Sequence, residues 1–301
     1  MSVDHDTYSA TPRDWWQAAR PHTWPNAFAP VIVGSAAAAY AGGFSWWRAL
    51  LALVVSWALI VGVNYANDYS DGIRGTDEDR TGPARLTGAR LARPAHVKRA
   101  AFLAFGVAAV AGVALALASS WWLLLIGAAA IAAAWFYTGG SNPYGYRGLG
   151  EVAVFVFFGL VAVLGTEFTQ AGAVSWIGLA GAVAVGAISA SVNLANNLRD
   201  IPSDSEAGKI TLAVRLGDRR TRYVYTALAA TPFLVSLLIG IQVPQLLLAV
   251  MAAPFALSGI RTALRGATGP ALIPLIKSTG QAMLLWAVIT GLVLFLNSPV
   301  L

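Results

Sequence analysis

The sequence predicts an all-α integral membrane protein in which nine transmembrane helices form one bundle with a parallel internal pseudo-repeat. Of its 301 residues, 57% are hydrophobic and 11% are charged, and the mean hydropathy is +0.64. This composition is typical of integral membrane proteins rather than of soluble domains. Polar clusters end two of the apolar runs, and they match each other in residue type and spacing. We expect a single domain over residues 1–301, with a polar segment over residues 1–20.

Nine apolar runs account for the predicted helices. A helix crosses a hydrocarbon core of about 30 Å with about 20 apolar residues. The runs approach that length and span residues 27–42, 49–66, 100–118, 121–138, 151–166, 174–195, 223–241, 243–260 and 279–296. Several are short and rich in Ala and Gly, as expected where helices pack through small residues. The first 20 residues are too polar for a cleavable signal peptide.

The distribution of basic residues predicts the orientation. If the N-terminus and the loops after the even-numbered runs share one side, that side holds 19 of the 20 Lys and Arg residues, and Arg48 alone lies opposite. The positive-inside rule makes the basic side cytoplasmic. We therefore expect a multi-pass cell-membrane protein with its N-terminus and active site facing the cytoplasm. Basic loops beside an anionic leaflet explain the net charge of +6 without a nucleic-acid partner.

Two matching polar clusters end the second and sixth runs, on the same predicted side. An offset of 129 residues pairs Asn64 with Asn193, Asn67 with Asn196, Asp68 with Asn197, Asp71 with Asp200 and Asp77 with Glu206. Amides and carboxylates are costly at the end of an apolar helix unless they are used. Because residues four apart share one face of a helix, each cluster presents an oxygen-rich surface. Two such surfaces predict a site for hard divalent cations.

The residue types restrict the metal. Cysteine is absent, which excludes disulfides, thiolate ligands and Cys nucleophiles. The three histidines, His5, His22 and His96, lack any zinc-like spacing. The ligands must therefore be oxygens, which suit Mg²⁺ or Mn²⁺.

Charged loops follow both clusters. Residues 72–83 could be a solvated connector, but this loop follows the first cluster directly, is unusually long and has a counterpart after the sixth run. There, Pro202 should end or kink the helix, so that Asp204 lies on a following turn. Carboxylates beside Arg74, Arg199 and Lys209 are the chemistry of a metal-bridged diphosphate.

Two further segments lie on the same predicted side. Residues 137–151 form either a Gly/Pro turn with interfacial tyrosines or a third part of the site, in which Arg147 reaches the same phosphate. Residues 84–99 alternate apolar and basic side chains and could form a lid on the membrane surface.

The motifs resemble those of a known family. Asn67-Asp68-x-x-Asp71 after the second run and Asp200-x-x-x-Asp204 after the sixth are similar to the two signatures of the UbiA superfamily of intramembrane prenyltransferases. The resemblance covers nearly the whole chain. Many members carry a further Asp where this chain has Gly75, with Asp77 two residues on. The Gly75-Thr76-Asp77 string and the run 208–217 resemble the MenA-type branch, which prenylates 1,4-dihydroxy-2-naphthoate.

The resemblance implies roles for individual residues and for the ligands. Mg²⁺ on the diphosphate of a polyprenyl donor would be bound by Asn67, Asp71, Asp200 and Asp204, with Asp68 and Asn196 in support. Asp71, Asp200 and Lys209 would act in catalysis. An acidic aromatic acceptor needs a further cation, for which Arg20 is the candidate. The expected partners are these two substrates and the lipid bilayer, with no obligate protein partner.

Two alternatives remain open. Another aromatic acceptor, such as 4-hydroxybenzoate or homogentisate, could replace the naphthoate. A secondary transporter would bind ions at polar helix breaks, but such sites lie near the bilayer midplane, whereas the charged residues here lie at or beyond helix ends.

Overall fold

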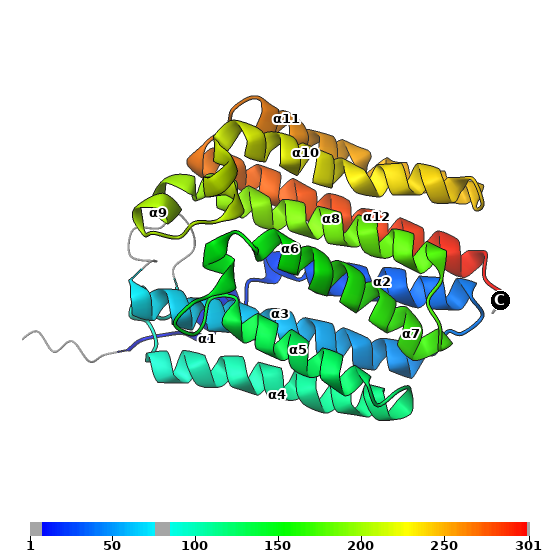
Figure 1. Ribbon diagram of the computed structural model, residues 1–301, viewed down its shortest axis with the longest axis horizontal. Coiled ribbons are helices and arrows are strands. Elements are labelled where there is room, and N and C mark those ends of the chain that lie inside the picture. The colour runs from blue at the N-terminus through cyan, green and yellow to red at the C-terminus, as the bar shows by residue number, and fades with distance from the viewer. Residues whose placement is uncertain (1–7, 76–84, 300–301) are drawn as a thin grey trace, which may run out of the picture.

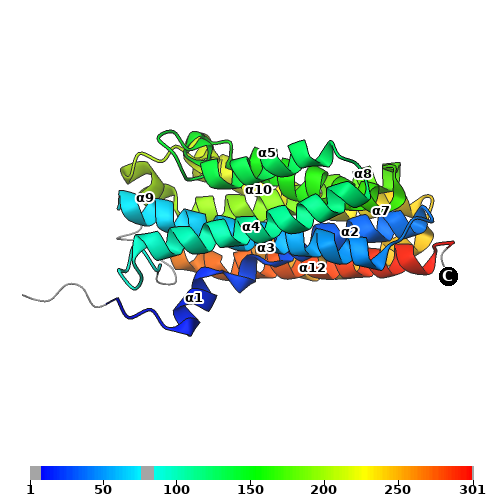
Figure 2. The same ribbon diagram turned by 90° about the horizontal axis from the view of Figure 1, so that it is seen from below.

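The computed structural model describes residues 8–75 and 85–299. Within these ranges every regular element is a helix, and the long helices lie side by side in one bundle (Figure 1, Figure 2). In chain order they are α1 (Pro12–Ala18), η1 (Pro21–Thr23), α2 (Pro25–Tyr40), α3 (Trp46–Arg74), α4 (Pro94–Ala118), α5 (Leu123–Phe136), η2 (Tyr144–Arg147), α6 (Gly150–Val154), η3 (Phe155–Leu164), α7 (Gly165–Ala171), α8 (Trp176–Arg199), α9 (Ile201–Glu206), α10 (Leu212–Gly240), η4 (Pro244–Ala252), α11 (Ala253–Leu264), η5 (Gly269–Leu272) and α12 (Ile273–Leu296). The all-α prediction is confirmed.

Each predicted run corresponds to a helical segment of the described chain. Seven segments are long and apolar enough to cross a membrane: α3, α4, the continuous helix from α6 to α7, α8, α10, the helix from η4 through α11, and the helix from η5 through α12. The remaining two, α2 and α5, have 16 and 14 residues. The protein is therefore a multi-pass membrane protein.

Helix α8 lies in the middle of the bundle, packed against α2, α10, α12 and η3. It approaches η3 closely, since a Cβ on Gly159 would lie 2.5 Å from Cα of Gly186. Lipid tails are as apolar as the helices, so helices associate in a bilayer through close packing, which small residues permit. Glycine at this crossing holds the wall formed by η3 directly against the helix that carries the second cluster.

The helix from α6 to α7 is not α-helical throughout. Its middle ten residues, Phe155–Leu164, form a π-helix. π-Helical geometry is rare, appears mostly as single turns, and is frequent at functional sites. Apolar periodicity gave no sign of it, because the run predicts only a helix of suitable length.

Two helices extend beyond their predicted ends. Helix α3 continues through Asp71 and ends at Gly75, whose φ of 74° places it in the left-handed region that favours glycine. Helix α10 begins at Leu212 and bends at Gly217, where φ is 72°. The first cluster therefore lies within a helix rather than in the loop after it. Helices α3 and α8 both end at the same end of the bundle, beside α9 (Figure 1), and we call this the motif end.

The role of residues 84–99 as a lid on the membrane surface stays a prediction. Residues 86–92 form turns, and α4 begins at Pro94. These turns are held against α3 by Asp68, whose two carboxylate oxygens accept from the backbone N–H groups of Leu86 and Thr87, both at 2.9 Å. Those hydrogen bonds satisfy two backbone N–H groups of the turns and hold them against α3.

Arg48 ties three helices together at the opposite end of the bundle. From the start of α3, its guanidinium donates to the carbonyl oxygens of Thr169 in α7, at 2.8 Å, and Ala118 at the end of α4, at 2.7 Å. Terminal carbonyls of a helix lack intrahelical partners and attract cations. The lone basic residue predicted on this side is thus used as a cap for two helices.

Candidate active site

The first cluster contributes two adjacent oxygen ligands from the last turns of α3. Asn67 and Asp71 are one turn apart and buried, 9% and 5% exposed. The Oδ1 atom of Asn67 accepts a 2.8 Å hydrogen bond from Thr138 Oγ1, and Oδ1 of Asp71 accepts one of 2.7 Å from the Tyr146 hydroxyl. The predicted shared face is present, and groups from the segment after α5 contact it.

The second cluster spans a helix break, as predicted. Helix α8 ends at Arg199, and Pro202 lies in the first turn of α9, where a missing N–H costs nothing. Asp200 therefore lies at the break and Asp204 in the next turn, each 6% exposed. Asp200 receives two hydrogen bonds from Arg199, of 2.6 and 2.8 Å, and Lys209 Nζ lies 3.3 Å from Asp204 Oδ1.

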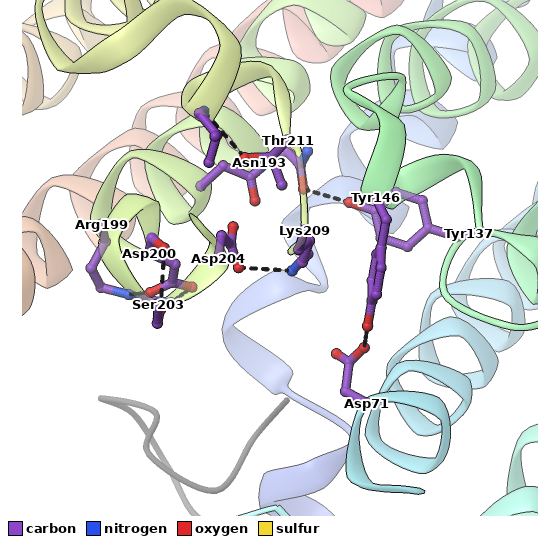
Figure 3. A network of polar contacts seen from close by, with 12 residues as sticks. Asp71, Tyr137, Tyr146, Asn193, Arg199, Asp200, Ser203, Asp204, Lys209 and Thr211 are labelled. Atoms are coloured by element: carbon purple, nitrogen blue, oxygen red, sulfur yellow. Dashed lines mark hydrogen bonds and ion pairs between the residues drawn. The ribbon is translucent and has the colours of Figure 1, made fainter. Parts of the chain in front are cut away.

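Tyr146 connects the two clusters (Figure 3). Its hydroxyl donates to Asp71 of the first cluster, and its backbone oxygen accepts from Ile210 N, at 3.0 Å, beside the second. The Lys209 ammonium lies 5.3 Å from the centre of the Tyr146 ring. A cation over an aromatic face is attracted by the ring quadrupole, so this tyrosine helps to hold Lys209 between the carboxylates.

The other predicted cations take different positions. Arg74 donates to the carbonyl oxygens of Thr138 and Gly140 and lies 5.6 Å from the Tyr146 ring centre, which ties α3 to the segment 137–149. Arg147 is exposed, and it is the neighbouring Tyr146 that faces the clusters. Asp77, with the rest of residues 76–84, lies outside the described residues, so its pairing with Glu206 stays a prediction.

An apolar cavity of about 490 Å³ opens from the clusters into the bundle. Its polar end is lined by Arg20, Asn64, Asn67, Asn193 and Asn196, together with Tyr137. The walls continue along α3, α4, α5 and the π-helix η3 as far as Thr169, whose carbonyl oxygen is bound by Arg48. Helix α5 forms one wall and has no buried residue. The shape suits a molecule with a polar head and a long apolar tail.

The polar end of the cavity is electropositive on one side. Burial and the nearby guanidinium groups of Arg20 and Arg199 lower the pKa of His22, so its imidazole is neutral at pH 7. Arg20 has an unusual backbone for a non-glycine residue, with φ at 50°. Arg20 lines the cavity together with asparagines from both halves of the repeat.

Two tyrosines outside the membrane-spanning helices border this end of the cavity. Burial raises the pKa of Tyr144 to about 12 and also raises the pKa of Tyr137. Both phenols are therefore protonated at pH 7 and serve as hydrogen-bond donors. Tyr144 donates to the carbonyl oxygen of Ala133 at 2.8 Å, and Tyr137 donates to Asn193 Oδ1 at 3.3 Å.

The ligand set fits a metal ion that is shared with a bound anion. Among the described residues no three Asp, Glu or His side chains converge on one point. Oxygen ligands instead come in two groups, Asn67 with Asp71 and Asp200 with Asp204. Mg²⁺ is commonly held in this way, by one or two carboxylates together with substrate phosphates.

Sequence reasoning missed Tyr146 and Glu151 as individual residues. Glu151 accepts hydrogen bonds from Asn193 and Asn197 of the second cluster. The signal for both was the segment 137–151 itself, which lies on the same predicted side as the clusters and places tyrosines and a carboxylate next to glycines.

Comparisons with known proteins agree with this arrangement. The model of the UbiA prenyltransferase family matches residues 27–286. A 1,4-dihydroxy-2-naphthoate octaprenyltransferase of Mycobacterium tuberculosis (strain ATCC 25618 / H37Rv) is 56% identical over 91% of this chain and 94% of that relative. The enzyme of the same name from Escherichia coli (strain K12) is 36% identical over 94% and 95%. A UbiA homolog from Archaeoglobus fulgidus, solved bound to GPP and Mg²⁺, has a TM-score of 0.69 at 15% identity and covers 94% of this chain and 99% of that one.

Proposed function

The chain belongs to the UbiA prenyltransferase family, and from this premise we propose that it transfers a polyprenyl group from polyprenyl diphosphate to 1,4-dihydroxy-2-naphthoate. The acceptor loses its carboxylate as CO₂, and the product is the quinol form of demethylmenaquinone, in a step of menaquinone biosynthesis. The observation that carries the proposal is the apolar cavity, whose polar end is bordered by asparagines of both clusters. A polyprenyl diphosphate has the matching arrangement, because it is a long apolar chain that carries an anionic group at one end.

Mg²⁺, or Mn²⁺, is the cofactor that the ligands fit. Asn67, Asp71, Asp200 and Asp204 would hold it, and Asn196, which lines the cavity, would support them. Both oxygens of Asp68 are occupied by backbone N–H groups, so we assign Asp68 to holding the turns 86–92 against the site. When bound, the metal supplies positive charge that neutralises the diphosphate oxygens as the donor ionises.

The residues of the chain carry out the remaining work. Lys209, with Arg199, provides cationic contacts for the diphosphate as the C–O bond breaks and its electron pair leaves with the phosphate. The apolar walls exclude water, which would otherwise capture the allylic carbocation. The ring carbon that bears the carboxylate then forms the new C–C bond. Loss of CO₂ leaves an electron pair that restores the aromatic ring.

We place the motif end at the cytoplasmic face, because the described Lys and Arg residues lie there almost without exception. Arg20 lines the polar end of the cavity and is assigned to the acceptor carboxylate. Arg147 is exposed at the same end, from which we assign it to drawing anionic substrates toward the site rather than to direct contact.

The acceptor can be tested by product mass. Purified protein incubated with Mg²⁺, a polyprenyl diphosphate and 1,4-dihydroxy-2-naphthoate is expected to give a product that lacks the carboxylate, with one CO₂ per prenyl group transferred. The same assay with 4-hydroxybenzoate and homogentisate serves as the comparison. A product that retains the carboxylate, or turnover with 4-hydroxybenzoate alone, would reject the naphthoate as acceptor and leave prenyl transfer in place.

Lys209→Met is expected to act through the donor. Methionine keeps most of the length of the side chain but removes the charge that lies between Asp204 and the Tyr146 ring. We expect kcat/KM for the prenyl diphosphate to fall by roughly tenfold to a hundredfold, the cost of one charged contact, while the acceptor KM changes little. Arg220→Met removes an exposed charge from the first turns of α10 and is the matched control. An effect confined to the acceptor KM would reassign Lys209.

A further inference from the structure

Glu151 is a buried carboxylate that neither the motifs nor the proposed metal site uses. It lies in the first turn of α6 and is 4% exposed. Its Oε1 atom accepts hydrogen bonds from two amides of α8, Asn197 Nδ2 at 2.6 Å and Asn193 Nδ2 at 3.2 Å. Its Oε2 atom is buried and has no hydrogen-bond partner among the described residues. A carboxyl group is costly to bury in this way, so a use for it is expected.

The Glu151 oxygen determines which way the Asn193 amide points. The Oε1 atom accepts from the amide nitrogens of Asn193 and Asn197, so the nitrogen of Asn193 faces Glu151. The amide oxygen of Asn193 then faces the other way, where it accepts from the Tyr137 hydroxyl. Asn193 and Tyr137 both line the polar end of the cavity, whereas Glu151 lies behind them.

The packing around this group depends on Gly150. A Cβ on Gly150 would lie 3.1 Å from the Tyr137 hydroxyl and 3.2 Å from Asn193 Nδ2. Both distances are tighter than ordinary van der Waals contacts, so a larger residue would displace one of the two side chains. The glycine before Glu151 therefore lets the backbone of α6 approach the amide closely.

The other half of the repeat holds its asparagine in the same way. Asn64, which corresponds to Asn193, donates through Nδ2 to the carbonyl oxygen of Ala19 and to Thr23 Oγ1, both at 3.0 Å. Asn64 also lines the polar end of the cavity. In both halves, acceptors behind the asparagine bind its nitrogen, which turns its oxygen away from them.

We propose that Glu151 is a positioning residue for prenyl transfer: it holds the Asn193 nitrogen back so that the amide oxygen faces the allylic carbon of the donor. The inference rests on the proposed function. Between departure of the diphosphate and attack by the ring, the allylic carbons carry a positive charge. A fixed amide oxygen carries partial negative charge and stabilises that cation without reorganisation. Unlike a carboxylate in direct contact, an amide is a weak nucleophile and does not capture the cation.

Two substitutions at Glu151 distinguish an effect of its negative charge from an effect on the orientation of the Asn193 amide. Glu151→Met fills the space but removes the acceptor, so the amide of Asn193 is free to turn. We expect kcat to fall by about a hundredfold, as when one preorganised dipole is lost, with the donor KM within about threefold of the wild-type value. Glu151→Gln keeps an acceptor oxygen and loses the charge. It should restore kcat to within about fivefold of the wild-type value, because the oxygen alone orients the amide.

Asn193→Ala supplies the decisive comparison. If Glu151 acts through Asn193, adding Glu151→Met to Asn193→Ala lowers kcat no further, because the amide to be oriented is gone. Independent losses that multiply in the double variant would overturn the proposal. A Glu151→Gln variant as slow as Glu151→Met would also overturn it, because the rate would then depend on the charge of Glu151 rather than on the orientation of the Asn193 amide.

Glu167 provides a matched control in the same membrane-spanning helix. It is fully buried at the opposite end, where its Oε1 accepts from Ser175 N before α8. Glu167→Met is expected to lower thermal stability and leave kcat nearly unchanged. Wild-type protein without prenyl transfer would reject the proposed function itself. A wild-type enzyme whose kcat is unaffected by Glu151→Met would reject only the role of Glu151.

Discussion

Asp71→Ala and Asp200→Ala are each expected to abolish prenyl transfer, with turnover lower by about a thousandfold or more, while the protein stays folded. The magnitude follows from the loss of a charge that helps to stabilise the departing diphosphate, in a site where water cannot take its place. The two residues correspond through the 129-residue offset, so their effects should be similar. The measurement is the initial rate with saturating Mg²⁺ and both substrates, alongside thermal unfolding of each variant.

Two control variants and a chelation experiment show whether the lost activity is due to the lost negative charge at this site. Asp71→Asn retains an oxygen to accept from Tyr146 but loses the charge, and it should be nearly as inactive as the alanine variant. Asp218→Ala removes a carboxylate that is 54% exposed and paired with Arg222, and its activity should be normal. Chelation of divalent metal should stop the wild-type enzyme and added Mg²⁺ should restore it. Full activity in excess chelator would disprove the metal requirement.

Gly165→Phe is expected to make the enzyme selective for short donors. Gly165 lines the cavity, and a Cβ there would meet no atom within 4 Å, so the phenyl ring enters open space. By helix rise the residue lies roughly 20 Å along the helix from Glu151. Overfilling a packed space costs about 1–3 kcal/mol, which corresponds to a loss of roughly fivefold to more than a hundredfold in kcat/KM with octaprenyl diphosphate. Geranyl diphosphate, which ends before this point, should be used as well as by the wild-type enzyme.

The control for that prediction is another open glycine. Gly106→Phe places the same ring on α4, where a Cβ also meets nothing within 4 Å and the position is exposed rather than part of the cavity. It should leave the preference for donor length unchanged. Equal losses with the long and the short donor for Gly165→Phe would show that the ring distorts the bundle instead of blocking the tail.

Much of the fold could be predicted because its causes are local. Long apolar runs define membrane helices, and residues four apart share a face, so the positions of Asn67 and Asp71 on α3 follow from spacing alone. Pro202 likewise marks the break before Asp204. The seven long spans with α2 and α5, and the common end of α3 and α8, agree with the prediction.

The parts that could not be predicted depend on contacts between distant segments. Arg147 was chosen because it carries a charge, but the turn at residues 144–147 directs its neighbour Tyr146 toward Asp71. The sequence predicts Asp68 as a further metal ligand, yet both of its carboxylate oxygens accept hydrogen bonds from backbone N–H groups 18 and 19 residues later. Any residue except proline supplies such N–H groups, so these hydrogen bonds cannot be recognised from the sequence.

The exposed helix α5 affects how the product leaves. This wall of the cavity has no buried residue, so the surface that borders the tail on one side borders lipid on the other. Hydrocarbon chains of a bilayer are as apolar as leucine side chains, and a prenyl tail that passes from the cavity into the membrane exchanges one apolar solvent for another. Each added prenyl unit therefore contributes little to the free energy of partitioning, and release of the prenylated product is governed by its ring.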